Sequence, residues 1–175
     1  MTQIPFLYYL EGNGIFPNSR LPVILFRHAL QLPKLFKASY IKKLFASHGW
    51  TNAWNSGIFT YDHYHSITHE VLGVFKGSTN ILLGGSDGRQ IRVGAGDVLI
   101  IPAGVAHRNL DTEMAVECIG AYPDGMDYDI NTGKPGERPA TDRNISVVPI
   151  PEQDPVYGKE QGLPKIWADA QARRR

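Results

Sequence analysis

The fold is decided by a short stretch that reads Gly57-Ile58-Phe59-Thr60-Tyr61-Asp62-His63-Tyr64-His65. Its alternating pattern predicts a β-strand, with the side chains of Phe59, Tyr61, His63 and His65 on one face. Two histidines that are two residues apart on a strand point to the same side, close enough for both imidazoles to bind one metal ion. The stretch therefore predicts half of a metal site.

Two further candidate ligands follow in the sequence. A turn through residues 66–68 returns the chain to Glu70, and antiparallel pairing brings this carboxylate back beside the histidines. His107 follows the tight bend Pro102-Ala103-Gly104, at the start of another predicted strand. Imidazoles and a carboxylate suit Fe(II), Mn(II), Ni(II), Cu(II) or Zn(II), and the absence of cysteine from the set argues against a closed structural zinc site. We expect one divalent transition-metal ion, bound by His63, His65, Glu70 and His107.

His69 is the alternative to Glu70, because a one-residue shift in the turn would exchange which of the two faces inward. We expect Glu70 to be the ligand and His69 to lie beside the ion, where it orients the substrate. Phe59 and Tyr61 share the face of the histidines and are expected to line the pocket, with Tyr61 or His69 handling protons. Trp54, which precedes the stretch, is expected to pack in the core.

Two segments of the chain resemble the two sequence motifs of the cupins. Gly57 to Gly77 reads glycine, five residues, His63-x-His65, four residues, Glu70, six residues and glycine. Gly96 to Asp111 reads glycine, five residues, Pro102-x-Gly104, two residues, His107, three residues and Asp111, where the motif prefers asparagine. The resemblance implies an all-β fold, the antiparallel RmlC-like jelly-roll barrel, whose interior holds the metal on the same four ligands.

A narrower resemblance is to the uncharacterised YjlB-like cupins. It rests on three phrases, which are His63-Tyr-His-Ser-Ile-Thr-His-Glu-Val-Leu-Gly73, Pro102-Ala-Gly-Val-Ala-His107 and Gly120-Ala-Tyr-Pro123. This group covers most of the length of the chain and implies no particular reaction.

Cupins in general host dioxygenation, isomerisation and decarboxylation, and the fold does not choose among them. We therefore expect a metal-dependent enzyme, an oxidoreductase or an isomerase, that acts on a small polar molecule. The alternative is a non-catalytic small-molecule-binding or sensor cupin in which the metal anchors the ligand. The lack of a helix-turn-helix pattern with basic recognition residues weakens the sensor hypothesis.

We expect one domain made of three parts. Residues 50–122 form the barrel, because short β-like runs alternate there with glycine turns. Residues 1–49 form an N-terminal extension with a strand at Leu21–Arg27 and an amphipathic helix within Leu30–His48. Residues 123–175 form a proline-rich arm, with a strand at Ile145–Ile150 and a helix at Leu163–Ala172. The predicted barrel strands are Gly57–His65, Glu70–Phe75, Thr79–Leu83, Gln90–Val93, Asp97–Ile101, His107–Leu110 and Met114–Ala121.

The charges of the chain nearly cancel, with 18 Lys and Arg against 17 Asp and Glu, so we expect no nucleic-acid partner and no attraction to an anionic membrane. The apolar stretches are too short to span a bilayer, and the N-terminus lacks a signal-peptide pattern. The single cysteine, Cys118, suits a reducing compartment, so we expect a cytoplasmic protein. Besides a small-molecule ligand, we expect a second copy of the chain as partner, in a homodimer that pairs through Leu21–Arg27 or the arm.

Overall fold

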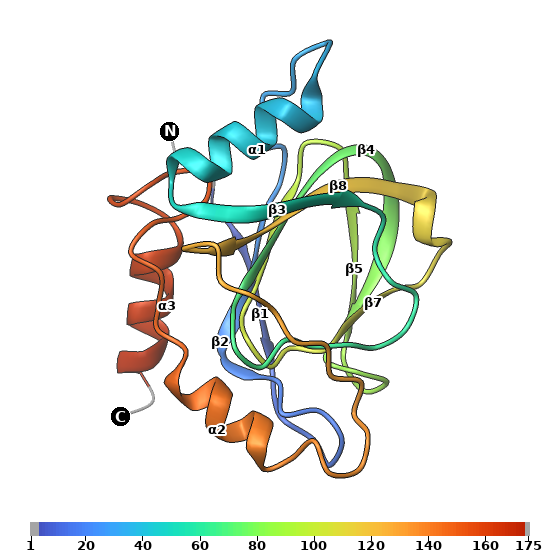
Figure 1. The fold of residues 1–175 in the computed structure, drawn as a ribbon, viewed down its shortest axis with the longest axis vertical. Helices are drawn as coiled ribbons and strands as arrows, with labels where there is room; N and C mark the ends of the chain where they lie inside the picture. The colour runs from blue at the N-terminus through green and yellow to red at the C-terminus, as the bar shows by residue number, and fades with distance from the viewer. Residues whose placement is uncertain (1–3, 174–175) are drawn as a thin grey trace.

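The computed structural model describes residues 4–173, which form eight β-strands, three α-helices and one short 3-10 helix. The strands are β1 (Phe6–Leu10), β2 (Ser19–Phe26), β3 (Trp50–Ser56), β4 (Glu70–Leu83), β5 (Arg89–Gly94), β6 (Val98–Ile101), β7 (His107–Asn109) and β8 (Val116–Pro123), and the helices are α1 (Lys37–Ser47), η1 (Glu113–Ala115), α2 (Ala140–Val147) and α3 (Leu163–Ala172). Figure 1 shows the strands curving around a central space, with the α-helices outside them. Every pair of named strands is antiparallel, which is consistent with a jelly roll.

Strand β4 joins the two halves of the barrel. Its first half pairs with β6 and β8, and its second half, from Ser78 onward, pairs with β5 and β7. The register shifts between Val74 and Lys76, and Gly77 adopts a φ of +74°, which favours glycine and allows the strand to bend there. The two segments predicted as Glu70–Phe75 and Thr79–Leu83 are therefore one continuous strand, because a bulge rather than a turn separates them.

Strands β2 and β6 and the first half of β4 are buried on both faces. Alternate residues such as Val23 and Leu25 face the inside of the barrel, where they join Leu72 and Leu99 in one apolar cluster. Their neighbours pack in a second cluster outside the barrel, which includes residues of α1 and α3. Burial on both sides explains why the sequences of these strands are continuous apolar runs instead of alternating ones.

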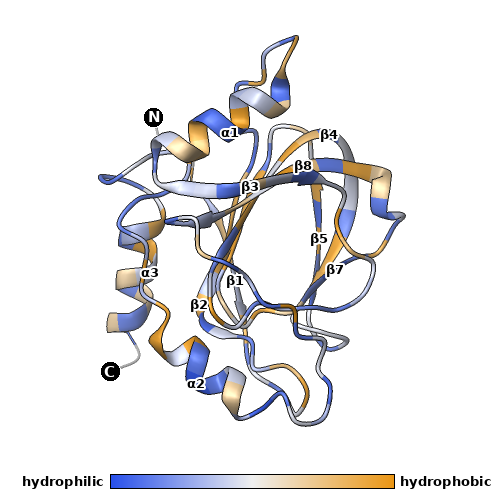
Figure 2. Cartoon of the chain, viewed as in Figure 1, coloured by the Kyte–Doolittle hydropathy of each residue, from blue (hydrophilic) through white to orange (hydrophobic). Residues whose placement is uncertain are grey.

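Helices α1 and α3 cover the outer face of the sheet by one side each, whereas Ile145 of α2 packs against a separate small cluster. Helix α1 approaches β4 so closely that a Cβ at Gly73 would lie 2.8 Å from Phe45 and 2.9 Å from Ile41. The indole N–H of Trp167 in α3 donates to the carbonyl of Pro22, 2.9 Å away in β2. In Figure 2 all three helices mix polar and apolar residues, as one-sided packing requires. Within residues 4–173 no helix combines the length and the hydrophobicity that a membrane crossing needs.

The prediction of a strand at Gly57–His65 is wrong. The hydrogen-bonded strand is β3, which ends just before this segment. β3 pairs with β8 from Trp50 to Ser56, and the chain then leaves the sheet. Beyond that point only scattered backbone hydrogen bonds join it to β7, including Asn109 N–H to the Phe59 carbonyl at 2.8 Å. Side-chain alternation therefore persists there without a ladder of hydrogen bonds.

Two other predictions at the ends of the chain also differ from the structure. Residues 145–147, where a strand was expected, complete helix α2, and residues 148–150 are irregular. β1 was not expected, and by pairing with the outer side of β2 it becomes the edge of the sheet. The strand predicted at Leu21–Arg27 is consequently an internal strand, paired with β1 on one side and β6 on the other.

Candidate metal centre

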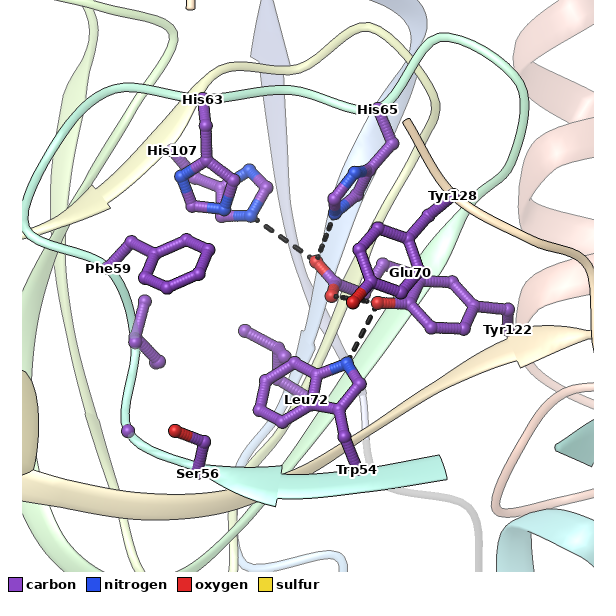
Figure 3. A pocket seen from close by; sticks show the side chains of 12 residues that line it. Trp54, Ser56, Phe59, His63, His65, Glu70, Leu72, His107, Tyr122 and Tyr128 are labelled. Carbon is purple, nitrogen blue, oxygen red and sulfur yellow. Dashed lines mark hydrogen bonds and ion pairs between the residues drawn. The ribbon is translucent and has the colours of Figure 1, made fainter. Parts of the chain in front are cut away.

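Three histidines and one glutamate meet inside the barrel (Figure 3). One ring nitrogen from each of His63, His65 and His107 lies within 4.8 Å of the others. Oε2 of Glu70 is 3.3 Å from Nε2 of His65 and also 3.3 Å from Nε2 of His107. All four side chains are buried. The four residues that the sequence predicted as ligands are thus brought together.

The backbone places each of the four residues for a different reason. Glu70 begins β4 opposite Ile101 of β6, and alternation puts it on the inner face with Leu72. His107 begins β7 opposite Leu83. His63 is held against His107 by two backbone hydrogen bonds, of 3.2 Å and 3.0 Å, although it lies outside any strand.

His65 is oriented by the segment that follows the barrel. Its Nδ1–H donates to the backbone carbonyl of Asp129, and the Asp129 carboxylate accepts hydrogen bonds from the backbone N–H and the hydroxyl of Ser66. Asn131 donates to the same carboxylate from 2.7 Å. Asp129 therefore connects residues 65 and 66 by hydrogen bonds to the start of the predicted arm. No sequence motif predicted this contact.

The tautomers of the three histidines suit a cation at the centre. Nδ1 of His63 faces the carbonyl of Tyr61 at 3.1 Å, and Nδ1 of His107 faces that of Val105 at 3.0 Å, as Nδ1 of His65 faces Asp129. A carbonyl only accepts hydrogen bonds, so each Nδ1 carries a proton and Nε2 is the nitrogen of each ring that can bind a metal ion. Nε2 of His65 and Oε2 of Glu70 are buried without a hydrogen bond. Three imidazole nitrogens and a carboxylate that converge in a buried place fit a divalent metal ion.

The pKa shifts agree with this view of the cluster. Burial and the nearby His107 lower the pKa of His63 to about 3, so His63 is a neutral donor at physiological pH. Burial alone would lower the pKa of His65, but the carboxylate of Glu70 outweighs it and raises that pKa above 6.5. Burial opposes ionisation of Glu70, yet His65 and His107 hold its pKa well below its usual range. A metal ion would have to displace the proton of His65, so metal binding should weaken as the pH falls.

A cavity of about 220 Å³ opens beside the four residues. Phe59, Leu72 and Tyr128 are among the residues that form its wall, and Trp54, which packs against the apolar cluster inside the barrel as expected, lines it too. The Trp54 indole N–H donates to the Tyr122 hydroxyl at 2.8 Å, which donates to Oε1 of Glu70 at 3.1 Å. This chain of hydrogen bonds leaves Oε2 of Glu70 facing the histidines. A Cβ at residue 120 would lie 2.1 Å from the Trp54 ring, so only glycine fits there.

Tyr61 and His69 lie apart from the cavity. Tyr61 is 46% exposed and stacks on Phe59, with ring centroids 5.0 Å apart. His69 faces the outer side of β4, where its Nδ1 accepts the Ala103 N–H at 2.9 Å and its Nε2 donates to the carbonyl of Pro149 at 3.1 Å. Its ring packs on Trp167 at 4.6 Å. Because successive residues of a strand point to opposite faces, Glu70 can face inward only if His69 faces outward.

The Asp129 carboxylate is expected to hold the metal site together. Replacing Asp129 by alanine removes the acceptor for Ser66 and frees the carbonyl that orients His65. Loss of such an outer partner typically costs 10–100-fold in metal affinity, so we expect a decrease of about 10-fold or more. Competition with a chromophoric chelator measures it. Asp127→Ala, a nearby exposed carboxylate, is the control and should bind metal as the wild type does.

The buried His69 is expected to make the fold sensitive to acid. Burial lowers its pKa to about 4, whereas the unfolded chain binds the proton near 6.5, so stability falls as the pH drops below 6.5. Between pH 7 and pH 5 this histidine should remove about 2 kcal/mol of the free energy of unfolding. Urea unfolding of the wild type and of His69→Gln at both pH values checks this. An equal loss in the two proteins would show that His69 is not responsible.

Comparison with known proteins finds a relative of similar length. No family model matches the chain. It is 37% identical over 161 residues to the "Uncharacterized protein YjlB" of Bacillus subtilis (strain 168), a match that covers 91% of this chain and 94% of that protein.

Solved structures give weaker matches. The acireductone dioxygenase from Bacillus anthracis, with cadmium in its active centre, is 14% identical, with 61% of this chain and 80% of that chain covered and a TM-score of 0.41. A point mutant of the oxalate decarboxylase OxdC from Bacillus subtilis is 20% identical, with 74% and 30% covered and a TM-score of 0.36. The vicilin from Solanum melongena is 21% identical, with 46% and 24% covered and a TM-score of 0.36. This chain spans less than a third of the decarboxylase and of the vicilin, and likenesses this weak do not bear on activity.

Proposed function

This chain belongs to the YjlB-like cupins, and we propose that it is an enzyme that depends on one divalent transition-metal ion held by His63, His65, Glu70 and His107. The observation that carries the proposal is the buried convergence of three imidazole nitrogens and the Glu70 carboxylate. All four groups can bind one cation, and a divalent ion would take the place of the proton that His65 holds beside Glu70. When bound, a divalent ion supplies a Lewis acid and, if it is redox-active, a centre for reaction with dioxygen.

The other residues of the cavity support an oxidoreductase more than an isomerase. Within residues 4–173, the titratable groups that line the cavity are the four proposed ligands, Tyr122 and Tyr128. Burial and Glu70 raise the pKa of Tyr122 well above its usual range, so Tyr122 stays protonated and holds Glu70 in place. An isomerase needs a group that takes up and returns a proton, and besides the four proposed ligands and Tyr122 the described lining offers only the Tyr128 hydroxyl for this task.

Oxygen uptake by the Fe(II)-loaded protein, measured across a panel of small 2-oxo acids and diketones, tests this function. We expect consumption of oxygen and formation of product with at least one compound, and loss of both in His107→Ala. Tight ligand binding without turnover, under every metal tried, would overturn the proposal and support a non-catalytic binding protein instead.

We also propose that the whole chain is one domain that forms a homodimer. The edge strand β1 supports the dimer, because Phe6 and Leu7 are 53% and 38% exposed there. Apolar side chains on an unpaired edge favour pairing with another strand. β1 replaces the Leu21–Arg27 strand as the candidate edge, since the latter is internal. Sedimentation at micromolar concentration should give twice the mass of the chain, and a monomer would refute the dimer.

A further inference from the structure

We infer that the substrate has one polar group that binds the metal, an otherwise apolar body and no second anionic group. This inference rests on the proposed function and names the substrate class of the same site. It follows from the division of the cavity into a polar end and an apolar end. Figure 3 shows the histidines with Glu70 at the polar end and Trp54 and Leu72 on the side away from the histidines, while the Phe59 ring lies beside His63.

The balance of charge allows one negative group on the substrate. A divalent ion with the Glu70 carboxylate and three neutral histidines leaves a net charge of about +1. One carboxylate or enolate of the substrate neutralises that charge. Once it is bound, the site has no positive charge left for another anion.

The walls offer no cation for a second anionic group. Among the described residues that line the cavity there is neither lysine nor arginine. Arg108 follows His107 in the sequence, but it does not line the cavity, and its Nε lies 3.8 Å from the carboxylate of Asp62. Besides the four proposed ligands and Tyr122, the described lining offers only the hydroxyl groups of Ser56 and Tyr128 and the indole N–H of Trp54, which bonds to Tyr122. A second carboxylate would thus lose its water among aromatic rings without gaining a counter-charge.

The apolar walls favour a substrate body without charge. Tyr122 and Tyr128 stack with ring centroids 4.8 Å apart and form one aromatic surface beside His65. Trp54 is bound to this surface through the Tyr122 hydroxyl. The volume of about 220 Å³ is below the range of roughly 300–1,000 Å³ that holds drug-sized ligands. The site therefore suits a small molecule with a branched or aromatic tail.

Two 2-oxo acids with the same metal-binding head make the test. 4-Methyl-2-oxopentanoate carries an apolar tail, and 2-oxoglutarate carries a second carboxylate. We expect the Mn(II)-loaded protein to bind the first at least 10-fold more tightly in calorimetric titration. Equal or tighter binding of 2-oxoglutarate would overturn the inference, and so would binding of neither acid by protein that holds its metal. Neither result would contradict the metal site itself. Protein that takes up no metal would instead refute the proposed function.

A variant at the cavity mouth provides a second test. Phe59 is 38% exposed, so an arginine can replace it with little strain in the core. We expect Phe59→Arg to raise the affinity for 2-oxoglutarate at least 10-fold relative to Phe59→Leu, the control that changes size without adding charge. No gain over Phe59→Leu would show that a missing cation does not decide the substrate class.

Discussion

Replacing His107 by alanine is expected to lower the affinity of the protein for a divalent transition-metal ion by more than about 100-fold. Outer partners of metal ligands already contribute 10–100-fold, and a direct ligand should contribute more. His107 is buried, and its Nε2 lies 3.3 Å from Oε2 of Glu70. The loss of His107 removes one of the four proposed metal ligands and also one of the two imidazoles that lie beside the Glu70 carboxylate. Competition with a chromophoric chelator of Zn(II) or Mn(II) measures the change.

An exposed histidine provides the control for this experiment. His28 lies outside the cluster with a φ of +47°, and asparagine tolerates that backbone conformation, so His28→Asn should fold and bind metal as the wild type does. If His107→Ala kept its affinity while its circular dichroism stayed native, His107 would not be a ligand.

Replacing Trp167 by alanine is expected to destabilise the fold by about 3–5 kcal/mol, the usual cost of truncating a fully buried tryptophan. Trp167 is completely buried between α3 and the outer face of the sheet. The variant would also leave the Pro22 carbonyl without its donor and open a space beside His69. Urea unfolding followed by far-ultraviolet circular dichroism measures the effect without relying on tryptophan fluorescence.

Lys165→Ala on the exposed side of α3 is the matched control, and it should change the free energy of unfolding by less than about 0.5 kcal/mol. A loss below about 1 kcal/mol in Trp167→Ala would mean that α3 adds little to the barrel. In that case residues 163–172 would be an attachment to the fold and not part of its core.

The inward position of Glu70 could be predicted because it depends on a period of two. Glu70 and Leu72 both line the cavity, whereas Val71 and the His69 ring, just before β4, both pack on the outer side with Trp167. Once the register of one apolar residue is known, the choice between Glu70 and His69 follows. The two-residue spacing of His63 and His65 was informative for the same reason, since residues two apart in an extended chain place their side chains on the same side.

Contacts made by backbone atoms could not be predicted from residue types. The carbonyl of Asp129 orients His65 across a separation of 64 residues, and any residue offers a carbonyl. The segment Gly57–His65 shows the converse, because the rings of residues 59, 61, 63 and 65 contact one another in a row while few of its backbone groups join a ladder. A strand needs a partner for its hydrogen bonds, and a single sequence does not show where that partner lies.

The role of Trp54 was also hidden in the sequence. β3 is a polar edge strand, so its tryptophan could face either the core or a cavity. The deciding feature is Gly120 on the neighbouring strand, which makes room for the ring beside Tyr122. Pairing of Trp54 with Gly120 is a property of the register between β3 and β8, which neither strand specifies alone.

The metal content of the protein tests the proposed site most directly. Elemental analysis of wild-type protein, purified without chelators, should give about one divalent transition-metal ion per chain. The double variant His63→Ala, His107→Ala should give almost none, provided that its circular dichroism remains native. Equal metal content in the two proteins would contradict the assignment of the ion to this cluster.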